Sequence, residues 1–236
     1  MAKQPGFRFK QFVVNHDQCA MKVGTDSIVL GSWLHDVCAD TILDIGCGSG
    51  LLALMMAQHN PKAKCIHGVD IDGAAVKQAQ DNIADSPWPS LITVSQQDIQ
   101  HLSIGPSYQL IVSNPPYFTP GIEIDSHRAT ARYTSNLDHA QLLAAVVKHL
   151  TTDGVFACVL PDSALGEFIK AAENVELFVR KQLLIVTKEG QPWSRVCLQF
   201  SRRKGDCKTD NLLVYKTNLQ YSEGFKSLCK DFYLNF

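Results

Sequence analysis

The residues of this chain best suited to chemistry lie in the stretch Asn114-Pro115-Pro116-Tyr117. They follow residues 111–113, which predict a buried strand that ends abruptly, because neither proline can donate a hydrogen bond to a neighbouring strand. The amide oxygen of Asn114 and the carbonyl of Pro115 can each accept one hydrogen of a planar NH2 group. The ring of Tyr117 can stack on the attached π-system. We therefore interpret Asn114, Pro115 and Tyr117 as catalytic candidates for a reaction at such an amine.

A glycine-rich loop at residues 46–50 indicates a second ligand. Gly46, Gly48 and Gly50 alternate after the apolar strand predicted over 41–45, so the backbone can approach a ligand with no Cβ in the way. Dinucleotide-binding folds prefer Gly-x-Gly-x-x-Gly, and here no basic residue stands in the loop to meet a phosphate. The loop, with Asp44 ahead of it, favours an uncharged linker carrying an amino-acid head group, as in S-adenosylmethionine.

Two further predicted strands lead into carboxylates. The strand over 65–70 ends in Asp70, at a distance from the loop where a carboxylate can accept both hydroxyls of a ribose. The strand over 91–95 leads to Asp98, which can accept from the amino group of an adenine. Because open parallel sheets bind ligands at the carboxyl ends of their strands, we expect these carboxylates and Asn114 at one edge.

The elements that must position these residues alternate along the chain. Helices are expected after Gly24, with Thr25 as the N-terminal cap, at 51–57, after Asp72, and later in the chain, with strands over 109–113 and 155–160. Residues 177–186 and 196–200 predict an antiparallel pair of strands joined at Gly190-Gln191-Pro192. The helix after Gly24 offers an anion-friendly N-terminus with Lys22 just ahead of it, so Lys22 and Thr25 join the cofactor-binding candidates. The polar stretch 119–136 predicts a loop over the site.

Composition is that of an ordinary globular domain: 236 residues, 45% hydrophobic and 19% charged. The longest apolar run, 51–57, is much shorter than the ~18 residues of a membrane helix, and the N-terminus has no hydrophobic signal segment. Eight cysteines without a Cys-x-x-Cys pair argue against a zinc or other metal site and favour reduced thiols in the cytoplasm. With a net charge of −1, a nucleic-acid partner must be met by a local basic patch.

The order of elements around the glycine loop resembles the class I S-adenosylmethionine-dependent methyltransferases. The resemblance implies an α/β fold with a seven-stranded, mostly parallel Rossmann-like sheet, helices on both faces and a reversed hairpin of the last two strands. It covers residues 24–200 and implies a single domain over 1–236, with an N-terminal extension at 1–23 and a C-terminal extension at 201–236. Asn114-Pro115-Pro116-Tyr117 resembles the signature of amino methyltransferases that act on adenine N6, cytosine N4 or a glutamine amide.

Residues 9–12 and 16–26 narrow the resemblance to the bacterial tRNA1(Val) adenine-N6 methyltransferases, which modify adenosine 37 beside the anticodon. The resemblance implies S-adenosylmethionine as cofactor, S-adenosylhomocysteine as product and the anticodon loop of a tRNA as partner. Carried over residue by residue, it assigns the cofactor and target contacts as follows: the methionine side to Asp44, Gly46 and Gly48, the ribose to Asp70, the adenine to Asp98, and the target amine to Asn114 with Tyr117. We expect RNA contacts from residues 7–12, predicted as an edge strand, and from Arg128, Arg132 and Arg202–Lys204.

Other functions remain open at this point. A protein-glutamine methyltransferase with the same Asn-Pro-Pro-Tyr motif ranks second, because residues 9–12 and 16–26 resemble the tRNA enzymes instead. A guanine-N2 RNA methyltransferase ranks third, since those enzymes tend to carry Phe at the Tyr117 position. The glycine spacing disfavours a nicotinamide oxidoreductase. A methyltransferase-like scaffold that binds RNA without catalysis is disfavoured because every expected ligand position is filled.

Overall fold

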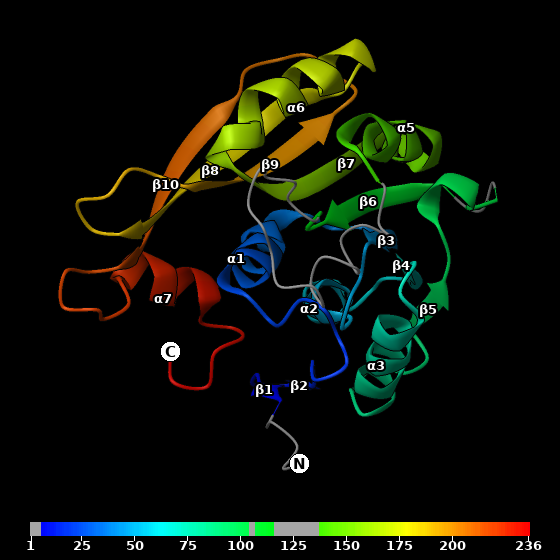
Figure 1. Cartoon of the computed structure of the whole chain (residues 1–236), viewed down its shortest axis with the longest axis horizontal. Coiled ribbons are helices and arrows are strands. Elements are labelled where there is room, and N and C mark those ends of the chain that lie inside the picture. The colour runs from blue at the N-terminus through cyan, green and yellow to red at the C-terminus, as the bar shows by residue number, and fades with distance from the viewer. Residues whose placement is uncertain (1–5, 104–106, 116–136) are drawn as a thin grey trace.

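The computed structural model of the chain describes residues 6–103, 107–115 and 137–236. Its centre is an eight-stranded sheet of order β10-β8-β9-β7-β6-β3-β4-β5, shown in Figure 1. Of these eight strands β9 alone is reversed, since it pairs antiparallel with both β7 and β8 while every other pair is parallel. The strands span Thr41–Ile45 (β3), Cys65–Asp70 (β4), Ile92–Gln96 (β5), Tyr108–Ser113 (β6), Leu150–Pro161 (β7), Phe178–Lys188 (β8), Arg195–Ser201 (β9) and Lys208–Tyr215 (β10).

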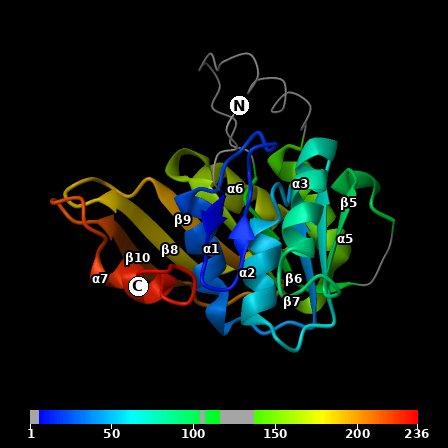
Figure 2. The ribbon, with the colours of Figure 1, turned by 90° about the horizontal axis from the view of Figure 1, so that it is seen from below.

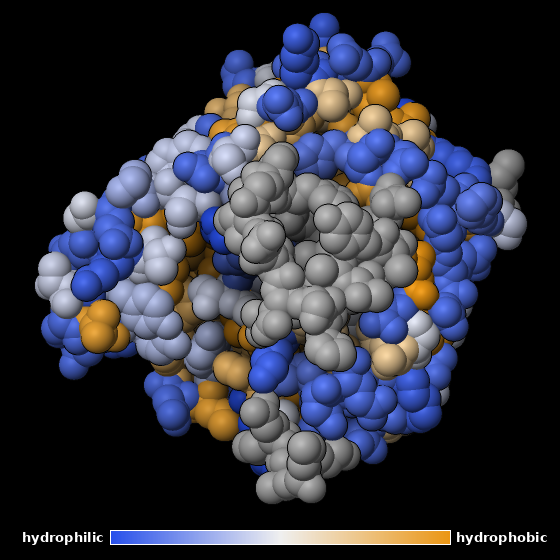
Figure 3. Space-filling view, viewed as in Figure 1, coloured by the Kyte–Doolittle hydropathy of each residue, from blue (hydrophilic) through white to orange (hydrophobic). Residues whose placement is uncertain are grey.

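Helices cover both faces of this sheet, as the turned view in Figure 2 shows. One face carries α1 (Thr25–Trp33), α2 (Leu51–His59), α3 (Gly73–Ala84) and α7 (Glu223–Cys229), and the other carries α5 (His139–His149) and α6 (Asp162–Asn174). Short 3-10 helices lie at Leu34–Asp36 and Ile99–His101. Each face has its own apolar core, so the sheet is buried on both sides. Hydrophilic residues dominate the outline of the molecule in Figure 3. Within the described ranges, no helix is long and apolar enough to cross a membrane.

Helices α2 and α3 follow directly from the sequence pattern. Residues 51–57 of α2 are all buried, because the helix lies between the sheet and its neighbours with no face to solvent. The next helix, α3, is amphipathic and buries Val76, Ala79 and Ile83. It begins where the Asp72 side chain accepts a hydrogen bond from the Ala74 amide at 2.9 Å, as an N-terminal cap should.

The predicted fold class is confirmed, with one strand more than expected. The reversed hairpin is β8 and β9, joined through residues 189–194, and the sheet continues beyond it to β10. This extra strand belongs to the stretch that the sequence places in a C-terminal extension. Its first half, Lys208 to Asn211, is polar, so the alternation that marks a strand is confined to Leu212 and Val214, which are buried on the α7 side. The division into domain and extensions stays a prediction.

The predicted edge strand over residues 7–12 is wrong. The chain instead makes a turn between two short strands, β1 (Phe7–Arg8) and β2 (Val13–Val14). Inside that turn the rings of Phe9 and Phe12 stack with centroids 4.7 Å apart, and both meet the edge of Phe232 near the other end of the chain. The Lys10 amide donates to the Phe232 carbonyl at 2.9 Å. The alternating pattern therefore reflects a cluster of three rings, Phe9, Phe12 and Phe232, which joins the N-terminal turn to the residues after α7. We call this cluster the aromatic lock.

Candidate functional site

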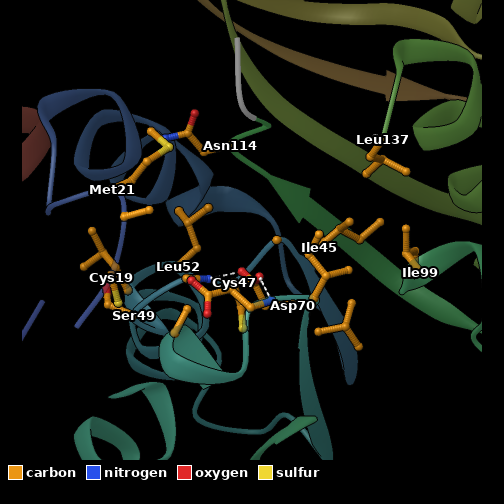
Figure 4. A pocket seen from close by; sticks show the side chains of 18 of the residues that line it. Cys19, Met21, Ile45, Cys47, Ser49, Leu52, Asp70, Ile99, Asn114 and Leu137 are labelled. Atoms are coloured by element: carbon orange, nitrogen blue, oxygen red, sulfur yellow. Dashed lines mark hydrogen bonds between the residues drawn. The ribbon is translucent and has the colours of Figure 1, made fainter. Parts of the chain in front are cut away.

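A cavity of about 630 Å³ lies at the carboxyl ends of β3, β4 and β6, where the sequence places its candidates. Lys22, Gly46, Gly48, Asp70, Asp98 and Asn114 all line it. Figure 4 shows Asn114 and Met21 on one side of the cavity and Cys47 and Asp70 on another, with Ile99 and Leu137 across from them. Among the predicted site residues, Thr25, Asp44 and Pro115 do not form its wall, and Tyr117 lies outside the described residues.

The glycine loop has the geometry that its spacing predicts. Gly46, Gly48 and Gly50 all have positive φ, at 69°, 52° and 80°, a region that side-chain-bearing residues rarely adopt. A Cβ built on Gly46 or Gly48 would meet no atom within 4 Å, so both glycines face open space in the cavity. At Gly50 a Cβ would approach Ala79 to 3.3 Å, which shows that the third glycine lets α2 and α3 pack closely.

Asp70 joins the loop to the end of β4. Its Oδ2 accepts from the Gly48 amide at 2.9 Å and its Oδ1 from the Asp72 amide at 3.0 Å. A carboxylate oxygen can accept more than one hydrogen bond, so Asp70 retains capacity for a pair of ligand hydroxyls. Burial raises the pKa of Asp70 above its usual value, while the two amides act in the opposite direction.

Asp44 lies beneath the glycine loop and is fully buried. One oxygen, Oδ2, accepts from the Ala53 amide in the first turn of α2 at 3.0 Å. The other, Oδ1, has no hydrogen-bond partner among the described residues. Burial raises the pKa of Asp44 to about 7. A buried carboxylate with an unused acceptor fits a cationic partner that the chain itself does not supply.

The remaining predicted ligands are placed as follows. Asp98 lines the cavity and its Oδ1 caps the 3-10 helix at Ile99–His101 by accepting from the Gln100 amide at 2.9 Å. The prediction that Thr25 caps α1 is wrong. Gly24 is the cap residue, with extended backbone and no side-chain hydrogen bond, and Thr25 is the first residue of the helix. Lys22 precedes it on the cavity wall.

Asn114 is held at the end of β6 from two sides. The preceding Ser113 donates its hydroxyl to the Ile45 carbonyl at 2.9 Å, which ties β6 to β3 at the point where both strands stop. The Asn114 amide donates from Nδ2 to Ser27 Oγ in α1 at 2.8 Å. Pro115 follows and is buried. Sequence reasoning missed Ser27, because a serine in the first turn of a helix is common and carries no signal of its own.

Sequence reasoning also missed how the segment 15–23 is held so that its residues 19–23 form a wall of the cavity. Two buried side chains of α3 hold this segment: Asn82 accepts from the Asn15 amide at 2.9 Å and donates to the Asn15 and Ser49 carbonyls, and Gln78 accepts from the Gln18 amide at 3.1 Å. The segment is thereby fixed beside the glycine loop. It brings Cys19 and Met21 to the cavity, as Figure 4 shows.

Comparison with known proteins places this chain in a family. A family model described as "Methyltransferase small domain" matches residues 18–166. The tRNA1(Val) (adenine(37)-N6)-methyltransferase of Salmonella typhi is 44% identical over 235 residues, which are 98% of this chain and 96% of that protein. This chain belongs to the family of tRNA1(Val) (adenine(37)-N6)-methyltransferases.

Solved structures agree with this family at the level of the fold. A predicted O-methyltransferase of Agrobacterium tumefaciens has a TM-score of 0.65 at 16% identity and covers 88% of this chain and 96% of its own. A glycopeptide N-methyltransferase, solved in complex with S-adenosylmethionine, has a TM-score of 0.56 at 10% identity over 75% of this chain and 94% of its own. At these identities the likeness shows a shared methyltransferase fold.

Among the residues predicted to contact RNA, the structure describes the surroundings of Arg202–Lys204. Arg202–Lys204 follow the end of β9. Because β9 runs antiparallel to β7, and β7 runs parallel to β6, the end of β9 lies at the sheet edge opposite the one where β6 leads into Asn114. The side chain of Arg202 donates to the Val147 carbonyl, Arg203 pairs with Asp153, and Lys204 lies 5.0 Å over the Phe178 ring. This placement argues against an RNA contact there. Arg128 and Arg132 lie outside the described residues.

The cysteines and possible metal ligands add no further site. All eight cysteines are free thiols, and Cys47, Cys158, Cys197 and Cys229 are buried. In the described ranges, no group of three or more His, Cys, Asp or Glu side chains is placed to hold a metal ion.

Proposed function

We propose that this chain transfers a methyl group from S-adenosylmethionine to the exocyclic N6 amine of adenine 37 in tRNA1(Val). The observation that carries the proposal is that Asn114 and the glycine loop line one cavity, so an amine held at β6 and a ligand lying on Gly46 and Gly48 would meet. The 44% identity to the Salmonella typhi enzyme along nearly the whole chain supports the choice of tRNA substrate.

The residues present fit the cofactor. Gly46 and Gly48 leave open space for a close-lying ligand, and the unused Oδ1 of Asp44 suits the ammonium of a methionine head group. Asp70, Asp98 and Lys22 line the same cavity, and we assign Asp70 to the ribose hydroxyls and Asp98 to the adenine amine, with Lys22 as a further cofactor contact near the N-terminus of α1. When bound, S-adenosylmethionine supplies an electrophilic methyl group on a sulfonium.

The protein's contribution is to orient the acceptor amine. The lone pair on N6 of adenine is delocalised into the ring. The N–H bonds of this amine are also far too weakly acidic for a side-chain base to remove a proton before methyl transfer. Accepting both N–H bonds at Asn114 Oδ1 and the Pro115 carbonyl biases the nitrogen toward sp3 geometry and aims its lone pair. Orientation of this kind can supply up to about 7–11 kcal/mol of a reaction barrier. Once methylated, the nitrogen is cationic and strongly acidic, so it releases one proton to water and no dedicated base has to remove that proton beforehand. Stacking on Tyr117 would add about 1–3 kcal/mol of binding.

A base beside the anticodon suits this site. Anticodon-loop bases are single-stranded, so turning one into the cavity costs less than extracting it from a duplex. Such a substrate places the enzyme in the cytoplasm, with its thiols reduced.

The experiment that tests the function uses labelled S-adenosylmethionine with two substrate pools, bulk unmodified tRNA and bulk protein, followed by nucleoside and amino-acid analysis. We expect label in N6-methyladenosine. Label in methylglutamine of the protein pool, or in N2-methylguanosine, would replace the proposal with the corresponding alternative. Thermal-shift titration is the control for the cofactor: S-adenosylhomocysteine should stabilise the protein and NAD should not.

A further inference from the structure

We propose that Ser27 is a positioning residue for methyl transfer, because its hydroxyl holds the NH2 end of the Asn114 amide and thereby aims the amide oxygen at the acceptor amine. The proposal rests on the function proposed above, in which Asn114 accepts an N–H bond of the target. A primary amide has an acceptor end and a donor end of nearly equal shape, and only the acceptor end can hold an N–H group. The amide must therefore be held with its oxygen toward the amine.

Ser27 contributes a hydrogen bond that holds the amide in this way. Asn114 donates from Nδ2 to Ser27 Oγ at 2.8 Å, and both residues line the cavity. With the NH2 end engaged on α1, Oδ1 must point away from Ser27, since the two ends diverge from one carbon. A reversed amide would set the carbonyl oxygen on Ser27 and turn an N–H bond toward the N–H bonds of the substrate. In that arrangement an N–H donor of Asn114 faces an N–H donor of the substrate, and the amide no longer holds the target amine.

The hydroxyl of Ser27 is itself fixed in space. Ser27 lies in the first turn of α1, and the following residues Ile28, Val29 and Leu30 are buried in the core, which prevents the helix from shifting. On the other side, Asp26 accepts an ion-paired hydrogen bond from Arg195 Nε at 3.1 Å, and the same guanidinium donates to the Ser194 carbonyl at 2.9 Å. The first turn of α1 is thus braced between β6 and the start of β9.

The test compares Ser27→Ala and Ser27→Thr in single-turnover methylation of tRNA, with cofactor affinity and melting temperature measured on the same proteins. Losing one net hydrogen bond corresponds to a fall of about two- to twelvefold in the rate of transfer. We expect this fall in Ser27→Ala with cofactor affinity, tRNA KM and melting temperature unchanged, and recovery in Ser27→Thr, which retains the hydroxyl. Ser227→Ala is the matched control, because Ser227 is an exposed serine on α7 that does not line the cavity.

A double-mutant cycle separates positioning from a general structural effect. In an Asn114→Ala background there is no amide to orient, so Ser27→Ala should have no further effect on the residual rate. A normal rate in Ser27→Ala, an equal loss in Ser27→Thr, a loss confined to KM or cofactor affinity, or additive losses with Asn114→Ala would each overturn the proposal. Failure of the wild-type chain to methylate tRNA would instead remove the proposed function, so the two outcomes are distinguishable.

Discussion

Binding of the cofactor should be linked to ionisation of Asp44. In the ligand-free protein burial raises the pKa of this carboxyl to about 7, so at neutral pH about half of the molecules carry a protonated, uncharged Asp44. The ammonium group of a methionine head group placed at the unused Oδ1 would bind the ionised form and exclude the protonated one. Proton release should therefore accompany binding.

The magnitude follows from the pKa. If only the ionised form binds, the apparent Kd is multiplied by 1 + 10^(pKa − pH), so affinity for S-adenosylhomocysteine should fall about eightfold between about pH 7.5 and about pH 6. The ligand stays mainly protonated in this window, because α-amino groups titrate near about 8. Isothermal titration at pH 7 in two buffers of different ionisation enthalpy should detect release of about half a proton.

The control is Asp44→Asn, which retains an oxygen to accept from the Ala53 amide and so preserves the first turn of α2. This variant should bind more weakly at about pH 7.5 and should lose the acid-side decline in affinity. A wild-type affinity that is the same at both pH values would refute the linkage to Asp44. The same decline in the variant would also refute it, because it would assign the effect to another group such as Asp70.

The other predictions concern transfer and stability. Asn114→Ala should bind S-adenosylhomocysteine normally and lose methyl transfer by orders of magnitude, because the amine is no longer oriented; near-normal turnover would remove its assigned role. Asp44→Asn should raise the free energy of unfolding of the ligand-free protein at about pH 8, by at most about 4 kcal/mol. Folding raises the pKa of Asp44 from 3.8 to about 7, so the wild-type protein loses stability as the pH rises through that range and the carboxyl ionises, whereas the variant has no carboxyl there to ionise. Urea unfolding at about pH 5 and about pH 8 checks this, and an equal pH dependence in both proteins contradicts it. Phe232→Ala should cost about 3–5 kcal/mol of stability, since its buried ring meets Phe9, Phe12 and His59, whereas exposed Leu234 provides a control that should change little on substitution by Ala.

Residues that follow strands or form glycine turns could be placed from the sequence, because their neighbours fix their position. Gly46, Gly48, Asp70 and Asn114 each stand at the end of an apolar strand, and parallel strands end at one edge of the sheet. Once the strands are recognised, the shared cavity follows. The hairpin of β8 and β9 could be placed for a similar reason, since Gly190 and Pro192 mark a turn between two apolar runs.

Contacts between distant segments could not be placed in this way. The hydrogen bond from Asn114 to Ser27 joins residues 87 positions apart, and nothing in the local pattern of either reports the other. The same holds for Asn82, which looks like an ordinary polar residue of α3 and in fact holds the chain near Asn15 beside the cavity. The strand β10 was missed because its polar first half hides the alternation.

The aromatic lock has a consequence for the order in which the molecule matures. Phe9 and Lys10 contact Phe232, so the turn between β1 and β2 cannot reach its final position until residue 232 has been synthesised. Contacts of such high sequence separation form late, because a long loop must be closed first. The segment that walls the cavity follows directly after β2. A nascent chain can therefore build most of its sheet early, yet it should acquire its methyl donor only after the residues around Phe232 have been synthesised.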